Sequence, residues 1–100
     1  MTITIENANE ITTAILVGRL DTPATTEATP YFEQLQNAAN GTVVLDCTGL
    51  SYISSSGLRL FITLRKAATA KGGKIIVKNL GDTIRQVFMM TGFLNLFEIQ

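Results

Sequence analysis

Three consecutive serines, Ser54, Ser55 and Ser56, are the side chains of this sequence best placed to do chemistry. They follow a short loop that holds one glycine and the polar residues Thr48 and Ser51, and they directly precede a segment whose apolar residues have helical spacing. A serine hydroxyl at the start of a helix can cap free N–H groups, attack a substrate, bind an anion or accept a phosphate group. The partner residues present in the sequence decide which of these four roles the serines can have.

Catalysis by one of these serines lacks the partner groups that it needs. A serine nucleophile is usually activated by a histidine, and the chain contains none. The nucleophile-elbow pattern Gly-x-Ser-x-Gly is absent, because Ile53 stands two positions before Ser55. A Ser–Lys pair assembled by the fold stays open, although no Ser-x-x-Lys pattern occurs. We therefore expect that the protein is not an enzyme.

Other reactive groups are equally sparse. The single cysteine, Cys47, follows an apolar segment, which favours a buried and inert thiol. A phosphatase loop would need an arginine six residues after the cysteine, and that position is Ile53. The phosphate-loop pattern Gly-x-x-x-x-Gly-Lys-Ser/Thr is absent, and metal-ligating histidines or clustered cysteines are missing. We expect no metal and no other cofactor.

The balance of charges limits the classes of partner. Lys plus Arg and Asp plus Glu number 8 each, so the formal net charge is zero. No basic excess exists to bind a phosphate backbone, so we expect no nucleic-acid partner. The longest apolar runs fall far short of the about 20 residues that a membrane span needs. With one cysteine and no visible secretory signal, a cytoplasmic location is predicted.

The first half of the chain predicts a hairpin followed by a helix. Residues 2–6 alternate polar and apolar, and we expect them to pair with a second strand over residues 11–18. Thr22 is expected to cap a helix with Pro23 at its first position, and the helix is expected over residues 24–39.

Two further features bear on that helix. Asn40-Gly41 is a plausible left-handed end to it. Pro30 lies inside it and is expected to kink or restart it, with Thr29 as a second cap.

The second half predicts alternating strands and helices around the serines. A buried strand over residues 42–45 leads into a short loop, and a helix is expected over residues 56–70. Its core-facing stripe comprises Leu58, Phe61, Leu64 and Ala68, whereas Arg59, Thr63 and Lys66 occupy the solvated face. A strand over residues 74–77, a helix ended by Gly92 and a short strand or edge segment over residues 95–99 complete the chain.

The resulting order of elements, β-β-α-β-α-β-α-β, favours an α/β fold with a mainly parallel sheet and helices packed on it. The length allows one core, so residues 1–100 are expected to form one domain.

Three blocks of this sequence resemble a known family. Val44–Leu58 is similar to an apolar strand, Asp, a short loop, an aromatic and an aliphatic residue, and then Asp-Ser-Ser/Thr-Gly-Leu. Gly18–Asp21 matches Gly-x-Leu-Asp at the end of the second strand, and Ile84–Phe93 looks like the last helix. The chain thus resembles the STAS domain, specifically the stand-alone bacterial anti-sigma factor antagonists, over nearly its whole length.

The resemblance implies a regulatory function. Such antagonists bind an anti-sigma factor that is also a serine kinase, and this binding frees a sigma factor. The kinase phosphorylates the serine after the motif aspartate, the modified antagonist dissociates, and a metal-dependent serine phosphatase reverses the modification. The acceptor implied here is Ser55. Ser54 replaces the motif aspartate, so Ser54 and Ser56 stay open as alternative acceptors.

The partner-binding residues implied in this way surround the serines. They are Asp21, Thr22, Ser54, Ser55, Ser56, Gly57 and Arg59. Asp21 and Thr22 are expected at the same sheet edge as the serines, because carboxyl ends of parallel strands share an edge, although capping a helix is an alternative role. Arg59 is expected to contact the partner, pair with the phosphate or remain solvated.

Two other functions stay open at this point. A STAS domain can be a constitutive scaffold subunit of a transporter or lipid-trafficking complex. Nucleotide binding is the third hypothesis, and no motif for it is present in the chain.

Overall fold

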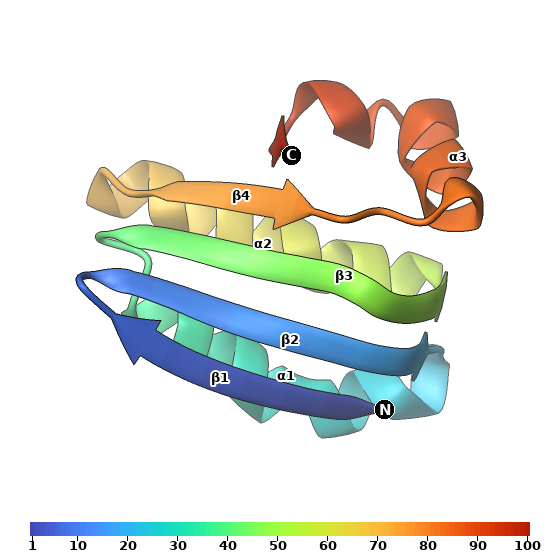
Figure 1. Ribbon diagram of the computed structural model, residues 1–100, viewed down its shortest axis with the longest axis horizontal. Helices are drawn as coiled ribbons and strands as arrows, with labels where there is room; N and C mark the ends of the chain where they lie inside the picture. The colour runs from blue at the N-terminus through green and yellow to red at the C-terminus, as the bar shows by residue number, and fades with distance from the viewer.

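Five strands form one sheet in the order β1-β2-β3-β4-β5, as the computed structural model of residues 1–100 shows (Figure 1). The strands are β1 (Thr2–Ala8), β2 (Ile11–Leu20), β3 (Thr42–Ile53), β4 (Lys74–Lys78) and β5 (Glu98–Ile99). The helices are α1 (Thr22–Asn37), α2 (Ser55–Lys71) and α3 (Asp82–Thr91), with a 3₁₀ turn, η1 (Phe93–Asn95). The β1–β2 hairpin is antiparallel and the other neighbours are parallel, which confirms the predicted α/β class.

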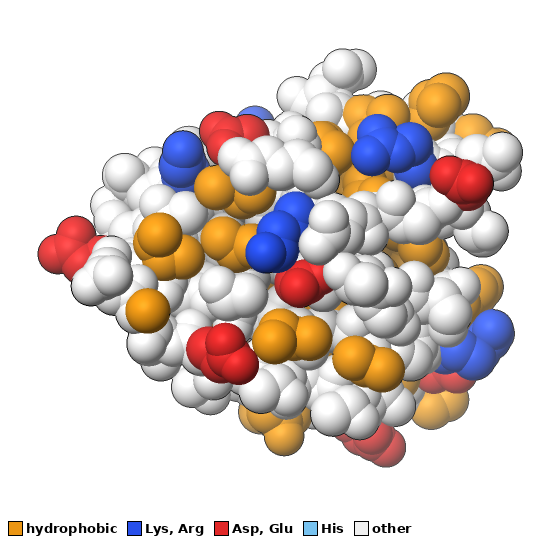
Figure 2. Space-filling model, in the orientation of Figure 1, with side chains coloured by type: hydrophobic (Ala, Val, Ile, Leu, Met, Phe, Trp, Pro, Cys, Tyr) orange, Lys and Arg blue, Asp and Glu red, His pale blue; other side chains and the backbone are white.

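The helices lie on one side of the sheet. Figure 1 shows α1 and α2 behind the strands, with α3 beyond the carboxyl end of β4. The buried residues of β2 and β3 alternate along each strand and face these helices. The opposite face of the sheet carries no helix, so it is open to solvent (Figure 2). One layer of helices on one sheet therefore makes the core.

Four phenylalanines join the helices in that core. The Phe61 ring on α2 lies 5.7 Å from that of Phe32, 5.9 Å from that of Phe88 and 6.2 Å from that of Phe97, measured between ring centroids. Phe32 belongs to α1 and Phe88 to α3. Because edge-to-face pairs add to the gain from burial, Phe61 is a central contact between the three helices.

Helix α2 follows its sequence prediction closely. Its predicted stripe is buried, and Arg59, Thr63 and Lys66 are exposed. The helix ends at Gly72, whose φ of 78° is the left-handed conformation that glycine adopts without strain. A Cβ on the next residue, Gly73, would lie 2.0 Å from the carbonyl oxygen of Ala39. Gly73 is therefore required by the close approach of two backbone segments.

Helix α1 differs from its prediction in three ways. It begins after Asp21, whose side chain caps it, so the predicted cap at Thr22 is wrong by one residue. It ends at Ala38, before the predicted Asn40-Gly41. Pro30 neither restarts nor interrupts it, and the Thr29 hydroxyl donates to the Thr25 carbonyl instead of capping. Pro30 is exposed, so water can satisfy the carbonyl that loses its partner.

Strand β3 is much longer than predicted. It continues through residues 46–53, which the sequence indicated as a loop. Its polar residues Asp46, Thr48 and Ser51 are those of a strand with one solvated face, while Cys47, Leu50 and Ile53 are buried. The pairing with β2 shifts register twice along the way, which allows the irregular spacing of the buried residues.

We expect Phe61→Ala to lower the free energy of unfolding by about 3–5 kcal/mol, because it removes a ring that contacts three others and leaves a cavity. Urea denaturation followed by circular dichroism measures this loss. Thr63→Ala on the exposed side of α2 is the matched control, with a change within about 0.5 kcal/mol. Equal effects of the two substitutions would contradict the central role of Phe61.

Candidate functional site

The serines lie where two parallel strands end side by side. Leu20, the last residue of β2, pairs with Ile53, the last residue of β3. Each strand leads directly into a helix, through Asp21 into α1 and through Ser54 into α2. The amino ends of α1 and α2 therefore share one end of the sheet, and α1 and α2 pack against each other. This confirms that Asp21 and Thr22 lie at the serine edge.

Ser54 is the residue that caps α2. Its backbone is extended, with φ −88° and ψ 170°, and its hydroxyl oxygen accepts a hydrogen bond from the Gly57 N–H at 3.1 Å. Its own backbone N–H donates to the Leu20 carbonyl at 2.9 Å, and its hydroxyl donates to the same carbonyl at 3.0 Å. Ser54 thus caps the helix and ties it to the neighbouring strand.

The hydroxyl of Ser54 has no capacity left for other chemistry. A hydroxyl has one hydrogen and two acceptor sites. Because the hydrogen of Ser54 goes to Leu20, the 3.0 Å contact between the Ser54 and Ser56 hydroxyls is a donation from Ser56. Ser54 is also buried, with 8% of its surface exposed. It is a structural residue.

Ser56 is held inside the site. Besides Ser54, its hydroxyl lies 3.4 Å from those of Thr22 and Thr25 on α1. The Thr25 hydroxyl donates to the Asp21 carbonyl at 2.9 Å, so its longer contact with Ser56 is secondary. Ser56 therefore links the first turns of the two helices.

Ser55 differs from both neighbours. It is the first residue of α2, it is exposed, and its hydroxyl makes no hydrogen bond within the chain. The Gly57 and Leu58 N–H groups of this turn bond to Ser54, which leaves those of Ser55 and Ser56 without a partner, and the helix dipole makes the position favourable for negative charge. Of the three serines, only Ser55 offers a free hydroxyl to another molecule.

The glycine after the serines is set by packing. A Cβ on Gly57 would lie 2.9 Å from the Leu20 side chain and 3.0 Å from that of Ile53. Gly57 is buried, and its lack of a side chain allows α2 to begin close to the two strand ends. Its contact with a partner stays a prediction. A larger residue would push the helix away from Leu20.

The remaining predicted residues have different surroundings. Asp21 accepts a hydrogen bond from the Ala24 N–H at 3.0 Å, so it caps α1, which is the alternative role expected for it from the sequence. Thr22 and Arg59 are exposed, and Arg59 forms no ion pair in this structure. Arg59 lies four residues after Ser55 on the same helix, which places the two side chains on one helical face.

A cation–π contact next to the site was not predicted from the sequence. Arg19 pairs with Tyr52 across β2 and β3, and its guanidinium carbon lies 4.3 Å from the centroid of the Tyr52 ring. Both side chains are exposed at the strand ends that lead to Asp21 and Ser54. The contact depends on the register shift between Gly18 and Arg19, which no sequence pattern indicated.

Two titratable groups of β3 are perturbed, and neither lies at the serines. Hydrogen bonding from the Thr48 hydroxyl, at 2.7 Å, lowers the pKa of Asp46 despite partial burial, and Asn79 adds a second side-chain donor. Burial raises the pKa of the Cys47 thiol to about 12, and the nearby Asp46 carboxylate adds to this effect. Cys47 is fully buried, which confirms the predicted burial of the thiol.

The arrangement at the serines is suited to accepting a transferred chemical group or to binding a partner protein. No cluster of three or more His, Cys, Asp or Glu residues could hold a metal ion in this structure. None of the helices has both the length and the apolar character needed to cross a lipid bilayer. The chemistry that the site offers is therefore one free hydroxyl at a helix amino end, beside exposed threonine and arginine side chains.

Comparison with known proteins agrees with this architecture. The family model of the STAS domain matches residues 2–100. BtrV of Bordetella bronchiseptica, provisionally named an anti-sigma factor antagonist, is 39% identical over 57 residues, which cover 57% of this chain and 49% of BtrV. The chain thus matches about half the length of that relative.

Solved structures share the fold at lower identity. The phosphorylated form of the Bacillus cell fate determinant SpoIIAA is 24% identical, with a TM-score of 0.75 covering 99% of this chain and 91% of that one. An anti-sigma factor antagonist from Mycobacterium paratuberculosis is 16% identical, with a TM-score of 0.86 covering 98% of this chain and 83% of that one. At these identities the likeness establishes the fold alone.

We expect Ser54→Ala to lower the free energy of unfolding by about 1–2 kcal/mol, because it removes the cap of α2 and the tie to Leu20. Ser55→Ala is the matched control, and its effect should stay within about 0.5 kcal/mol because its hydroxyl makes no internal hydrogen bond. Urea denaturation of both variants tests the assignment. A larger loss for Ser55→Ala would reverse the roles of the two serines.

We expect the native Cys47 thiol to resist a thiol reagent at about pH 8, because it is buried and a thiol with so high a pKa stays protonated. Colour release from Ellman's reagent measures the reaction. The same chain in urea should react at the rate of an ordinary cysteine. Fast labelling of the native chain would contradict the burial of the thiol.

Proposed function

Because the chain belongs to the STAS domain family, we propose that it is an anti-sigma factor antagonist switched by phosphorylation of Ser55. In its unmodified form it binds an anti-sigma factor that is also a serine kinase, and the sigma factor is released. Phosphorylation of Ser55 by that kinase ends the binding, and a serine phosphatase restores it. The chain itself is a binding module of the cytoplasm and no enzyme. The name of its relative BtrV supports the antagonist class.

The observation that carries this proposal is the free hydroxyl of Ser55. A kinase needs a hydroxyl that can reach its active site and lose its proton there. Ser54 is buried and fully hydrogen-bonded, and Ser56 is held between two helices. Ser55 has neither restraint. This favours Ser55 over the two alternative acceptors.

Phosphorylation at this position is compatible with the fold. A phosphate group adds about −1.5 to −2 charges at neutral pH. At the first residue of α2 those charges face the positive end of the helix dipole and the free N–H groups of the first turn. The modified chain therefore keeps its structure, and the change is confined to its surface.

The same charge is unfavourable for a docked partner. A partner surface that fits the small, neutral Ser55 would have to bury the phosphate without matching donors, and burying an unpaired charge is costly. Arg59, four residues along α2, is placed to pair with the phosphate. That pairing would make the Arg59 guanidinium unavailable to the partner, while the phosphate itself adds negative charge to the surface. Both effects favour dissociation.

The absence of the motif aspartate does not remove the structural basis of the switch. The side chain before the acceptor serves here as the helix cap, and Ser54 performs this role through its hydroxyl oxygen. Ser54 adds the donation to Leu20, which a carboxylate has no hydrogen to make. Ser55 is therefore presented by a cap of different chemistry at the same position.

We predict that Ser55→Asp weakens binding to the anti-sigma kinase by at least about tenfold, or roughly 1.4 kcal/mol. The partner is isolated by pull-down with the wild-type chain, identified by mass spectrometry and then titrated with each variant. Thr63→Asp adds the same charge to an exposed position of α2 and is the matched control, with unchanged affinity. Both variants should unfold at the same urea concentration as the wild type, within the error of the measurement.

Incubation of the purified partner with ATP and the chain provides the second part of this test. Mass spectrometry should locate the phosphate on Ser55, and Ser55→Ala should remain unmodified. Equal binding of wild type and Ser55→Asp would overturn the switch and favour a constitutive scaffold. A phosphate on Ser56 with Ser55 unmodified would overturn the assigned acceptor.

A further inference from the structure

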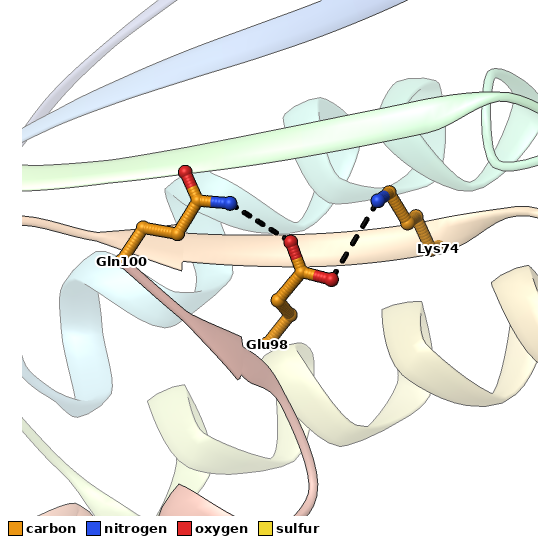
Figure 3. A network of polar contacts seen from close by, with 3 residues as sticks. All are labelled: Lys74, Glu98 and Gln100. Carbon is orange, nitrogen blue, oxygen red and sulfur yellow. Dashed lines mark hydrogen bonds and ion pairs between the residues drawn. The ribbon is translucent and has the colours of Figure 1, made fainter.

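The two edge strands of the sheet, β5 and β1, differ in how they are protected against pairing with another chain. At one edge, β5 has only two residues, and Glu98 pairs with Lys74 at 3.5 Å while accepting from Gln100 at 2.8 Å (Figure 3). Short, charged edges are a common protection against pairing with another chain. This edge therefore has two such protections.

The opposite edge is longer and carries only one charge. Strand β1 has seven residues, Thr2–Ala8, and pairs without a bulge along its whole length with β2 alone. It contains no Lys, Arg, Pro or Gly, and its one charged residue is Glu6. Its outer backbone groups are thus available to a further strand, and its β-branched side chains favour one.

A cleft accompanies this edge on the helix side. A space of about 300 Å³ lies between β1 and α1, and its lining combines apolar Ile3, Ala28 and Tyr31 with polar Thr2 and Glu27. Ile3 and Ile5 point to the helix side but are only half-buried, and 43% of the Tyr31 side chain is exposed. The core is therefore incomplete at the same edge at which the backbone is unpaired.

We propose that β1 pairs antiparallel with β1 of a second copy of this chain, about a two-fold axis that passes beside Thr4. In this register Thr4 lies opposite Thr4 of the second copy, Ile3 opposite Ile5, and Thr2 opposite Glu6. Facing residues of antiparallel strands share a face of the sheet. The isoleucines of both copies then meet on the helix side and complete the apolar cluster beneath the edge.

Self-complementarity is the reason to choose a second copy as the partner. A two-fold interface needs one patch that matches itself. Pairing about Thr4 matches apolar Ile3 with apolar Ile5 in both directions and sets each Glu6 against a neutral threonine. A register centred on Ile5 would place Ile3 opposite the polar Asn7, whose side chain already accepts a hydrogen bond from Thr12. The register about Thr4 is therefore favoured.

The pairing has a consequence for binding. The two-fold axis reverses strand direction, so the carboxyl ends of β2 and β3 in the two copies point to opposite ends of the joined sheet. Each Ser55 lies at such an end. The dimer would therefore present two separate sites, and it stands whether or not Ser55 is a phosphorylation site.

Disulfide trapping tests the register. Thr4→Cys should form a disulfide-linked dimer on mild oxidation, because directly opposed Cβ atoms lie about 4.5–5.5 Å apart, near the disulfide range. Thr2→Cys is exposed on the same face of the same strand, but its symmetry mate would be four residues away, about 13 Å. Non-reducing gels should show at least about tenfold more dimer for Thr4→Cys. The native Cys47 is buried and does not compete.

Mass measurement in solution tests the association itself. Light scattering should give twice the 10.8 kDa chain mass for the wild type and the chain mass for Thr4→Lys, in which two lysines face each other. Circular dichroism checks that this exposed substitution leaves the fold intact. A monomeric wild type, a dimeric Thr4→Lys, or equal trapping of Thr4→Cys and Thr2→Cys would each overturn the proposal.

Discussion

The carbonyl of Leu20 is the group on which the site depends. Leu20 is the last residue of β2, and its carbonyl accepts hydrogen bonds from both the backbone N–H and the hydroxyl of Ser54, the N-cap of α2. These two hydrogen bonds fix the start of one helix against the end of the neighbouring strand. The absence of a side chain at Gly57 is required by the same proximity, since a Cβ there would collide with Leu20. The parallel pairing of β2 and β3 thus decides the position of every hydroxyl in the site.

Much of this fold can be read from the sequence because its helices have regular apolar spacing. The stripe from Leu58 to Ala68 is buried as its spacing predicts, and the order of elements is enough to indicate a parallel sheet. The prediction failed where local composition is ambiguous. A strand with one solvated face carries the same polar residues as a loop, so the extent of β3 past Leu45 depended on its partner β2. The predicted restart of α1 at Pro30 was wrong because the exposure of Pro30, which makes it tolerable inside a helix, is a tertiary property.

The position of the serines beside Asp21 and Thr22 at one sheet edge could be predicted, whereas the different hydrogen bonding of the three serines could not. Three identical residues in a row have identical propensities, and each of them is a good helix cap. What separates them is distance to groups remote in sequence: Ser54 reaches Leu20, Ser56 reaches Thr22, and Ser55 reaches neither. The contact of Arg19 with Tyr52 was out of reach for a similar reason, because a register shift in the β2–β3 ladder produces it.

This division of roles bears on how a switch at Ser55 would act. A modification that broke the Ser54 hydrogen bonds would loosen the start of α2. The disturbance would reach the core through Leu58 and Phe61. Ser55 has no such bonds, and the helix dipole favours the added charge. The proposed phosphorylation would therefore act on the surface that a partner meets, and the free energy of unfolding would change little. In the proposed switch, the hydrogen-bonded Ser54 and Ser56 would keep the scaffold constant while Ser55 gains the charge.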